Sequence, residues 1–415
     1  MTRNLPRHRL SIALGAGALL LAGCAGTAPA AAPPTSSSPA ADGHGSVAGA
    51  AQVDEPPLQL VSIDEEGAVG VLDLLDGTAV ELGEIGAPTA VATDGRYVFA
   101  TTEAGVEIVD SGTWTWDHVD HFHYYRAEPR LVGTLEGSGT AAVSTGPLAT
   151  AGATGIVLGE DAVLLDNKAL SNGEIVETLR LDAGSADGII APLGAGALVS
   201  EADADGRVQS LRFAPAEGDQ AEAETPCVDA EGTITTRVGL VVGCADGAVL
   251  ATVDRGEPVF ERIPYPEGTT AERATAFDGR KGRPTVAALA GERGFWLLDT
   301  RERAWRLVET EAPLLRVAAV DDADGHVVAL DVEGRVRVYL AETGAEIGAS
   351  EPLLPQTLAD ADALAGVSLT VDAQRAYVNA PLEGVVHEIA YADGARVARS
   401  LETPTAPAFV AEVGR

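Results

Sequence analysis

The sequence predicts an all-β protein built as a single β-propeller of seven or eight four-stranded blades. Strand-like segments with period-two alternation and many β-branched residues are separated by Gly- and Asp-containing turns, while amphipathic helix patterns are almost absent. Motifs that begin with a glycine also recur every 38 to 54 residues, which is the length of one four-stranded blade. A pair of all-β sandwiches is the alternative, but it does not explain this regular spacing.

The first 23 residues predict a lipoprotein signal peptide. A basic start, MTRNLPRHRL, precedes the apolar run SIALGAGALLLAG, which is too short to span a bilayer. The run ends in Leu-Ala-Gly-Cys24, which resembles the lipobox after which bacterial lipoproteins are lipidated on the cysteine. An ordinary secretory signal that contains a cysteine is the alternative. Both interpretations place the mature chain outside the cytoplasm, and the first anchors it to the membrane by lipid alone.

Residues 24–56 predict a lipidated Cys24 followed by a disordered linker. This segment is rich in Ala, Pro, Ser and Gly and has almost no large apolar residue, so burial cannot offset its chain entropy. His44, its one histidine, is interpreted as incidental. The propeller domain is expected to occupy residues 57–415.

The repeated motif predicts the blades. Each copy is a turn with glycine followed by a strand, and a second short apolar strand precedes many copies. The copy GEDAVLLDN is degraded, which leaves the number of blades at seven or eight. The eight glycines that begin the copies are Gly67, Gly105, Gly159, Gly206, Gly247, Gly294, Gly334 and Gly384.

Two Asp-rich stretches look like calcium loops but are interpreted as turns of the repeat. ADADG (202–206) and DDADG (321–325) both lack the glutamate expected at the twelfth position of such a loop. Each falls where a blade needs a tight Asp-Gly turn. His326, directly after the second stretch, is interpreted as a strand histidine with a structural hydrogen bond.

The charge indicates which partners to expect. The formal net charge is −34, and removal of the three signal-peptide arginines makes it about −37. Such a chain repels nucleic acid and anionic membrane surfaces, and it attracts cations. The two cysteines that remain after Cys24, Cys227 and Cys244, predict a disulfide in an oxidising compartment.

One stretch, WTWDHVDHFHYYRAEPR (114–130), has a composition unlike the rest of the chain. It holds three of the seven histidines, His118, His121 and His123, together with five of the 18 aromatic residues. Neutral imidazole is a preferred zinc ligand, and four ligands complete a tetrahedral site. In an extended segment His121 and His123 project to one face, and His118 and Asp120 to the other. A bend would gather all of them around one ion. If the segment stayed extended, each face would supply half of the ligands of a separate site.

Neighbouring residues extend this predicted metal site. Asp117, Asp120 and Glu128 are candidate carboxylate ligands or hydrogen-bond acceptors for the imidazoles, and His387 on a distant strand is a weaker candidate. Zinc is favoured over copper because the mature chain has neither methionine nor a free thiol. The strand GVEIVD before the stretch and RLVGTL after it place the histidines in the connection between two blades, where binding residues commonly collect.

The residues DHVDHFHYYRAEP, the cysteine pair around GLVVGCADG, and the ending YVNAPLEGVVHEIAYADG together resemble the AztD-type zinc metallochaperones. These are extracytoplasmic β-propellers that pass zinc to the solute-binding protein of a zinc-uptake ABC transporter. The resemblance implies that His118, His121 and His123 bind Zn²⁺ with a nearby aspartate, and that the chain is not an enzyme. Two other functions stay open from the residues alone: a zinc-dependent hydrolase with Asp117, Asp120 or Glu128 as general base, and a metal-free scaffold for protein–protein interaction.

Overall fold

The structure is a computed structural model that describes residues 44–118, 121–185, 187–217 and 223–415. The chain divides into two units, residues 1–40 and residues 41–415, and all of the described residues belong to the second unit. The predicted signal peptide, Cys24 and the linker up to residue 43 lie outside the described residues. Among the described residues, no helix is both long and apolar enough to cross a lipid bilayer.

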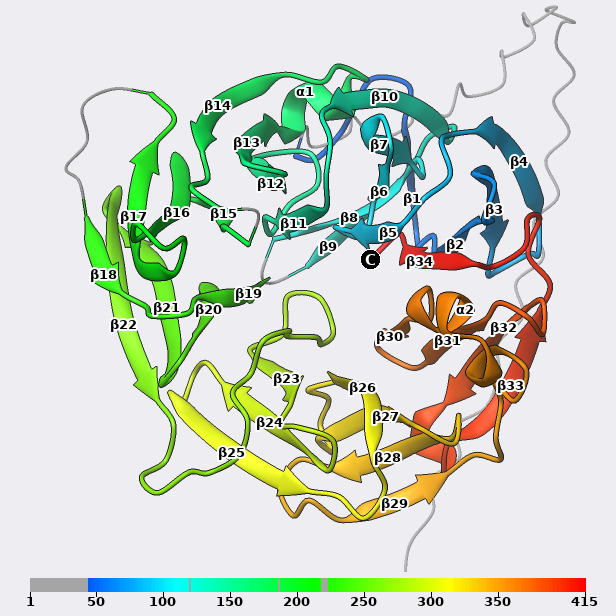
Figure 1. Cartoon of the computed structure of the whole chain (residues 1–415). Helices are drawn as coiled ribbons and strands as arrows, with labels where there is room; N and C mark the ends of the chain where they lie inside the picture. Colours follow the sequence, from blue (N-terminus) through cyan, green and yellow to red (C-terminus); the bar gives the residue numbers. More distant parts are fainter. Residues whose placement is uncertain (1–43, 119–120, 186, 218–222) are drawn as a thin grey trace, which may run out of the picture. The chain divides into compact units, whose positions relative to one another are not determined.

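Eight antiparallel sheets follow one another around a ring, as Figure 1 shows. We number these blades from the one that contains β2. Blade 1 consists of β34 (Phe409–Val413), β2 (Gln59–Ile63), β3 (Ala68–Asp73) and β4 (Ala79–Glu84). Blade 2 consists of β5 (Ala90–Thr93), β6 (Tyr97–Thr102), β7 (Gly105–Asp110) and β10 (Arg130–Glu136). Blade 3 consists of β11 (Ala141–Thr145), β12 (Ala153–Leu158), β13 (Asp161–Asp166) and β14 (Glu177–Asp182), with the short helix α1 (Asn167–Ser171) after β13.

The next three blades continue the ring. Blade 4 consists of β15 (Ile190–Leu193), β16 (Gly196–Ala202), β17 (Val208–Pro215) and β18 (Glu224–Pro226). Blade 5 consists of β19 (Glu231–Thr235), β20 (Leu240–Cys244), β21 (Gly247–Asp254) and β22 (Glu257–Pro264). Blade 6 has three strands, β23 (Thr285–Leu289), β24 (Gly294–Asp299) and β25 (Ala304–Glu309). An isolated bridge between Asp278 and Ala287 stands where its innermost strand would be.

The last two blades complete the ring. Blade 7 consists of β26 (Leu314–Ala319), β27 (His326–Asp331), β28 (Val336–Leu340) and β29 (Glu346–Ala349). The short helices η1 (Thr357–Ala359) and α2 (Ala361–Ala365) precede blade 8. Blade 8 consists of β30 (Leu369–Val371), β31 (Ala376–Ala380), β32 (Val385–Ala390) and β33 (Arg396–Leu401), with η2 (Tyr391–Asp393) between its last two strands.

The glycine repeat of the sequence corresponds to one position in every blade. In the seven four-stranded blades, the repeat glycine lies between the second and third strands or begins the third strand. In blade 6 the corresponding glycine, Gly294, begins β24. The degraded copy at Gly159 forms the turn before β13 of a complete blade. The prediction of a β-propeller is therefore confirmed, and the described residues form eight blades.

The hydrophobic core consists of eight layers, and each layer lies between two successive blades. Between blades 1 and 2, for example, Val61 and Val71 pack with Val98 and Val109. Between blades 8 and 1, Tyr377 and Val386 pack with leucines of blade 1. Successive side chains of a strand point to opposite faces of the blade. Since each face packs on a neighbouring blade, each blade contributes apolar residues to two layers.

Blade 1 combines the two ends of the propeller domain. Its strand β34, near the C-terminus, pairs with β2 in the register Gln59↔Val413 to Ile63↔Phe409. This pairing hydrogen-bonds the last described strand to the first blade, while the apolar layer between blades 8 and 1 packs the same junction. The ring is therefore closed by backbone hydrogen bonds between residues more than 340 positions apart.

Glu412 lies on this closing strand and is only 1% exposed. Its Oε2 lies 3.0 Å from Nε of Arg415. Burial raises the pKa of Glu412 from 4.5 to about 7, although the Arg415 charge acts in the opposite direction. Below about pH 7 the folded state therefore favours the protonated form of this carboxyl group.

We expect Glu412 to make the propeller less stable as the pH rises. Because its pKa is higher in the folded than in the unfolded state, its contribution is fully present below pH 4.5 and is lost as the pH rises through about 7. Glu412→Gln imitates the protonated form and should remove this dependence. Urea unfolding between pH 4.5 and 7.5 should show the variant gaining about 3 kcal/mol relative to the native chain over that interval. If the free energy of unfolding of the two proteins changed with pH in the same way, the raised pKa of Glu412 would be contradicted.

The two Asp-rich stretches form turns, as predicted. Residues 202–206 connect β16 to β17, and the side chain of Asp203 accepts hydrogen bonds from the main-chain N–H groups of Asp205 and Arg207. Residues 321–325 connect β26 to β27, and the side chain of Asp322 accepts a hydrogen bond from the main-chain N–H of His326. His326 is buried, and its Nδ1 lies 2.6 Å from Oδ2 of Asp322, which agrees with a structural role.

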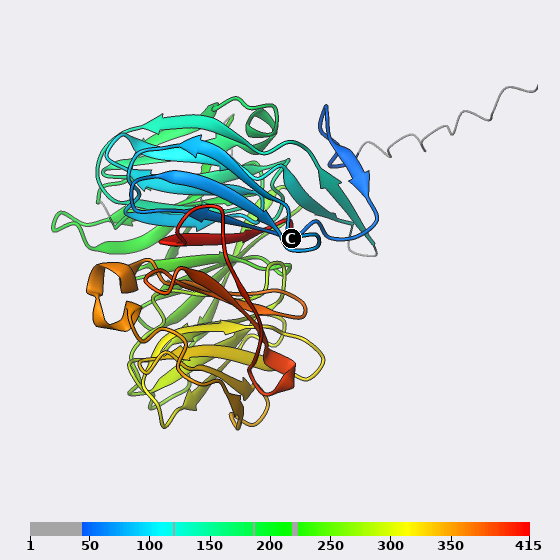
Figure 2. The same ribbon diagram turned by 90° about the vertical axis from the view of Figure 1, so that its right-hand side faces the viewer.

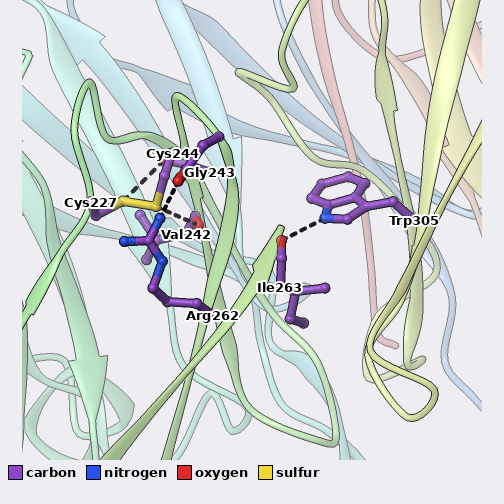
Figure 3. Close-up of a disulfide and its surroundings, with 8 residues drawn as sticks. Cys227, Val242, Gly243, Cys244, Arg262, Ile263 and Trp305 are labelled. Atoms are coloured by element: carbon purple, nitrogen blue, oxygen red, sulfur yellow. Dashed lines mark hydrogen bonds and ion pairs between the residues drawn. A yellow bond between two sulfur atoms is a disulfide. The ribbon is translucent and has the colours of Figure 1, made fainter. Parts of the chain in front are cut away.

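The predicted disulfide is confirmed. Cys227 and Cys244 are bonded, and both are buried in the layer between blades 4 and 5 (Figure 3). Cys227 lies in the connection between these blades, and Cys244 ends β20. The bond therefore fixes the connection to blade 5, and it fits an oxidising compartment. Figure 3 also shows Trp305 of blade 6 donating from Nε1 to the carbonyl of Ile263 on blade 5.

Candidate metal centre

The histidine-rich stretch forms a hairpin that is inserted into blade 2. Its strands are β8 (Thr113–Asp117) and β9 (Phe122–Arg126), and β1 (Ala51–Val53) pairs with β9 to make a separate three-stranded sheet. The chain leaves blade 2 after β7 and returns to the same blade as β10. The prediction that the histidines connect two blades is therefore wrong, because RLVGTL completes blade 2. Figure 2 shows this small sheet projecting from one face of the ring.

Two buried aromatic side chains fix the hairpin on the propeller. Trp114 of β8 and Tyr125 of β9 are each 1% exposed, and their rings stack with centroids 5.3 Å apart. On the propeller side, the guanidinium carbon of Arg96 lies 3.9 Å from the Trp114 ring centroid. Such a cation–aromatic contact is strong where solvent is excluded. The base of the hairpin is thus rigid, which suits a site that must hold its ligands in place.

The three predicted histidines meet at the free end of this hairpin. His118 follows β8, His121 precedes β9 and His123 is the second residue of β9. The main-chain N–H of His118 donates to the carbonyl of His121 at 2.9 Å, which holds these two residues side by side. One ligand nitrogen from each ring lies within 4.8 Å of the others. The structure therefore brings the three histidines together in one cluster.

This geometry fits a tetrahedral ion with a small adjustment. The Nε2 atoms of His121 and His123 are 3.1 Å apart. Two nitrogens on one tetrahedral zinc lie about 3.3 Å apart, given Zn–N bonds of about 2.0–2.1 Å. The ring of His118 has to move by about 1–2 Å to reach the same spacing, which a half-exposed side chain allows. The cluster could supply three nitrogen ligands, and a tetrahedral ion would need a fourth ligand from another group.

Gln52 of β1 contacts the cluster from the side. Its Nε2 lies 3.1 Å from Nδ1 of His123. If Nε2 of His123 binds a metal, Nδ1 carries the proton and needs an acceptor. A rotation of the Gln52 amide presents its oxygen instead of its nitrogen, so this residue can satisfy either tautomer.

Two of the predicted carboxylates, Asp117 and Glu128, are not in the cluster formed by the described histidines. Asp117 ends β8, and its Oδ2 accepts from Nη2 of Arg237 on blade 5 at 3.0 Å. Glu128 is exposed and lies beyond β9, on the segment that returns to blade 2. Asp120 lies outside the described residues. Among the described side chains, the cluster of possible ligands contains the three histidines alone.

Two further residues have structural partners elsewhere. Arg126 forms an ion pair with Asp73 of blade 1, which ties the hairpin to a second blade. His387 lies on β32 of blade 8, and its Nδ1 is 3.1 Å from Oγ of Ser400 on the neighbouring strand. Burial lowers the pKa of His387. The structure does not bring this histidine to the cluster.

Sequence reasoning missed the segment 44–56. Its composition predicts a disordered linker, but β1 pairs with β9 in the register Ala51↔Arg126 to Val53↔Tyr124. His44 lies against the cluster, with its ring centroid 5.0 Å from that of His118. The prediction of a linker that extends to residue 56 is thus wrong for these residues. The side chains of this segment give little sign of its position, because its main-chain groups make most of its contacts with the hairpin.

No protein-family model matches the chain, and no curated protein matches it in sequence. Solved structures do. A structure of apo AztD from Citrobacter koseri has a TM-score of 0.73 and 18% identity, and the match covers 87% of this chain and 98% of that one. A second AztD structure from the same organism has a TM-score of 0.71 and 19% identity, with 86% and 97% covered.

The chain has the AztD fold. A dihydro-heme d1 dehydrogenase, NirN, is a more distant match, with a TM-score of 0.52 and 16% identity over 87% of this chain and 76% of that one. Identities this low establish the AztD-like architecture alone. The function of this protein therefore has to be inferred from the residues of the hairpin.

Proposed function

We propose that this protein is an extracytoplasmic zinc metallochaperone that delivers zinc to the solute-binding protein of a zinc-uptake ABC transporter. The observation that supports this proposal best is the cluster of His118, His121 and His123 at the free end of a hairpin that projects from the ring. A carrier has to bind its ion firmly and still let a partner reach it. A site with three imidazoles at a projecting tip meets both needs.

Charge and compartment support the same function. A net charge of −34 raises the local concentration of cations around the protein. The disulfide agrees with a location outside the cytoplasm, where the zinc-uptake system of the resembling family works. In this proposal Cys24 carries the lipid that keeps the carrier near the membrane-bound transporter.

The contacts that the structure describes around the cluster give no support to a hydrolase. A catalytic zinc site keeps a carboxylate ready to accept a proton from the bound water. Here Asp117 is paired with Arg237, and Glu128 is outside the cluster. A cavity of about 670 Å³ lies among blades 3 to 6, but the residues that line it include no histidine of the cluster.

Zinc loading tests the proposal directly. The mature protein is incubated with excess zinc, desalted and analysed for metal, and we expect one tightly held zinc per chain. The loaded protein is then mixed with the metal-free solute-binding protein of a zinc transporter. We expect transfer at a rate that increases with acceptor concentration and exceeds spontaneous release to a chelator. A chain that retains no zinc would instead indicate a metal-free scaffold.

A further inference from the structure

The cavity of about 670 Å³ lies on the face of the ring opposite the hairpin. It is lined by the beginnings of the innermost strands of blades 3, 4 and 5, which are β11, β15 and β19 (Figure 1). The hairpin instead leaves blade 2 at the end of β7, which runs parallel to the innermost strand β5. Because the blades repeat around the ring in one orientation, strand beginnings and strand ends lie on opposite faces. The cavity is thus separate from the candidate metal centre.

The irregular start of blade 6 forms one side of this cavity. Residues 272–277 belong to no strand, although they lead into the bridge at Asp278, where an innermost strand would run. They pass close to blade 5, since a Cβ at Gly232 of β19 would lie 2.4 Å from the carbonyl oxygen of Thr275. Gly232 also has a φ of +76°, which favours glycine. The space that remains has the size of a small-molecule site, which is about 300–1,000 Å³.

The walls of the cavity combine apolar side chains with hydroxyl groups. Val143, Ile190 and Phe277 supply apolar surface from three different segments. Ser144 and Thr233 are the lining residues farthest along β11 and β19, and their hydroxyl oxygens are 2.8 Å apart. Blades 3 and 5 therefore meet at the inner end of the cavity. Such a mixture of apolar wall and a few polar groups is typical of sites for organic molecules.

Four charged side chains of the lining form one network. Arg207 donates from Nε and Nη2 to the two carboxylate oxygens of Asp229. Arg273 donates from Nη2 to Oε2 of Glu231 at 2.5 Å. The hydrogen bond from Arg207 lowers the pKa of Asp229, and the charge of Arg273 lowers it further. The two ion pairs are therefore close enough to act on each other.

The guanidinium of Arg273 has a donor that the protein leaves unused. Its Nη1 is buried and makes no hydrogen bond within the described residues. Buried donors without a partner are rare in folded proteins, because they lose their bonds to water. A guanidinium commonly binds a carboxylate through two parallel hydrogen bonds, as Arg207 does here. The side chain of Arg273 is 28% exposed, so a small rotation brings Nη1 within reach of an acceptor in the cavity.

We propose that this cavity binds a small organic carboxylate. Its carboxylate group accepts hydrogen bonds from Arg273, and its carbon body lies against Val143, Ile190 and Phe277. Since the chain as a whole carries a charge of −34 and repels anions, the attraction has to come from this guanidinium. Glu231 competes for the same group and is 54% exposed, so it can turn to solvent when the ligand binds. The site is independent of the proposed zinc function.

Arg273→Gln tests the proposal, with Arg180→Gln as the matched control because Arg180 is a half-exposed, ion-paired arginine outside the cavity. The probes are hexanoate, 3-methylbutanoate and 4-phenylbutanoate, and calorimetry measures their affinities. We expect the native chain to bind at least one of them and to bind the corresponding neutral amide about tenfold more weakly, since a charged hydrogen bond is lost. Arg273→Gln should weaken binding of the acid by a similar factor. Arg180→Gln should have native affinity.

Glu231→Gln should change the affinity in the opposite direction. Removal of the competing carboxylate frees Arg273, so the probe should bind several-fold more tightly. Asp161→Asn is the matched control, because it removes one negative charge from an exposed ion pair outside the cavity. Urea unfolding checks that each variant is folded, and the comparison of acid with amide uses the native chain alone.

Three results would overturn the proposal. The first is that the native chain binds none of the three probes. The second is that folded Arg273→Gln retains native affinity, or that the native chain binds acid and amide equally. The third is that Glu231→Gln binds the probe more weakly than the native chain, which would show that the network only holds the cavity in shape.

Discussion

Replacing His118, His121 and His123 together with alanine is expected to abolish zinc binding and to leave the propeller folded. Four ligands of a zinc site share a binding free energy of about 10–16 kcal/mol, so losing three of them should weaken binding by at least about 1000-fold. The fold should persist, because the hairpin is fixed by Trp114 and Tyr125 and not by the histidines. Competition with a chelator measures the affinity, and urea unfolding of the metal-free proteins measures the stability.

Single substitutions refine this expectation. His121 is the exposed member of the cluster, while His118 and His123 are half-buried. Each single alanine variant should bind zinc more weakly than the native chain and more tightly than the triple variant, since two hairpin ligands remain. His387→Ala should have native affinity. Native affinity in the triple variant would show that zinc, if bound, is bound elsewhere in the chain.

The largest loss of stability is expected from Asp110→Ala. Arg96 and Asp110 are each 1% exposed, and two hydrogen bonds of 2.8 Å join the guanidinium to the carboxylate. Asp110 also accepts from the N–H of Gly112 at 3.0 Å, at the point where the chain enters the hairpin. Removing the carboxylate leaves a buried positive charge without its partner, which typically costs about 3–5 kcal/mol.

An exposed ion pair provides the control. Asp161 and Arg180 are 54% and 40% exposed and lie 2.7 Å apart. Since solvent screens such pairs, Asp161→Ala should lower the free energy of unfolding by at most about 1 kcal/mol. Urea unfolding of both variants gives the comparison. Equal losses would mean that Arg96 finds another partner or enough solvent when Asp110 is absent.

The blades could be predicted from the sequence because each one repeats the same local chemistry. A glycine turn between two apolar strands is visible in a short window, and all eight copies, including the degraded one at Gly159, form that turn in a blade. Strand pairing across an insertion is not visible in such a window. β7 and β10 are neighbours in blade 2, but the hairpin separates them in the sequence. The sequence therefore suggested a connection between blades where the structure has a connection within one blade.

The candidate histidine cluster could be predicted from the sequence for similar reasons. Three histidines in six residues are conspicuous in a chain with seven, and one hairpin brings them together. His44 is distant in sequence, and the contacts that place it involve carbonyl groups, which every residue has. Composition describes only the side chains, so it could not distinguish residues 44–53 from a disordered linker. The sequence likewise did not show that Arg237, 120 residues away, donates a hydrogen bond to Asp117.

The insertion within blade 2 has a consequence for how such a protein can arise. At the base of the hairpin, Asp110 and Arg130 are directly paired residues of β7 and β10, so the two ends of the insertion already stand at the spacing of adjacent strands. A plain turn can join two such strands in an ordinary blade. The candidate metal centre is therefore a cassette inserted into a scaffold whose ring closes elsewhere, through β34 and β2. Evolution, or a protein engineer, can exchange the cassette without redesigning the ring.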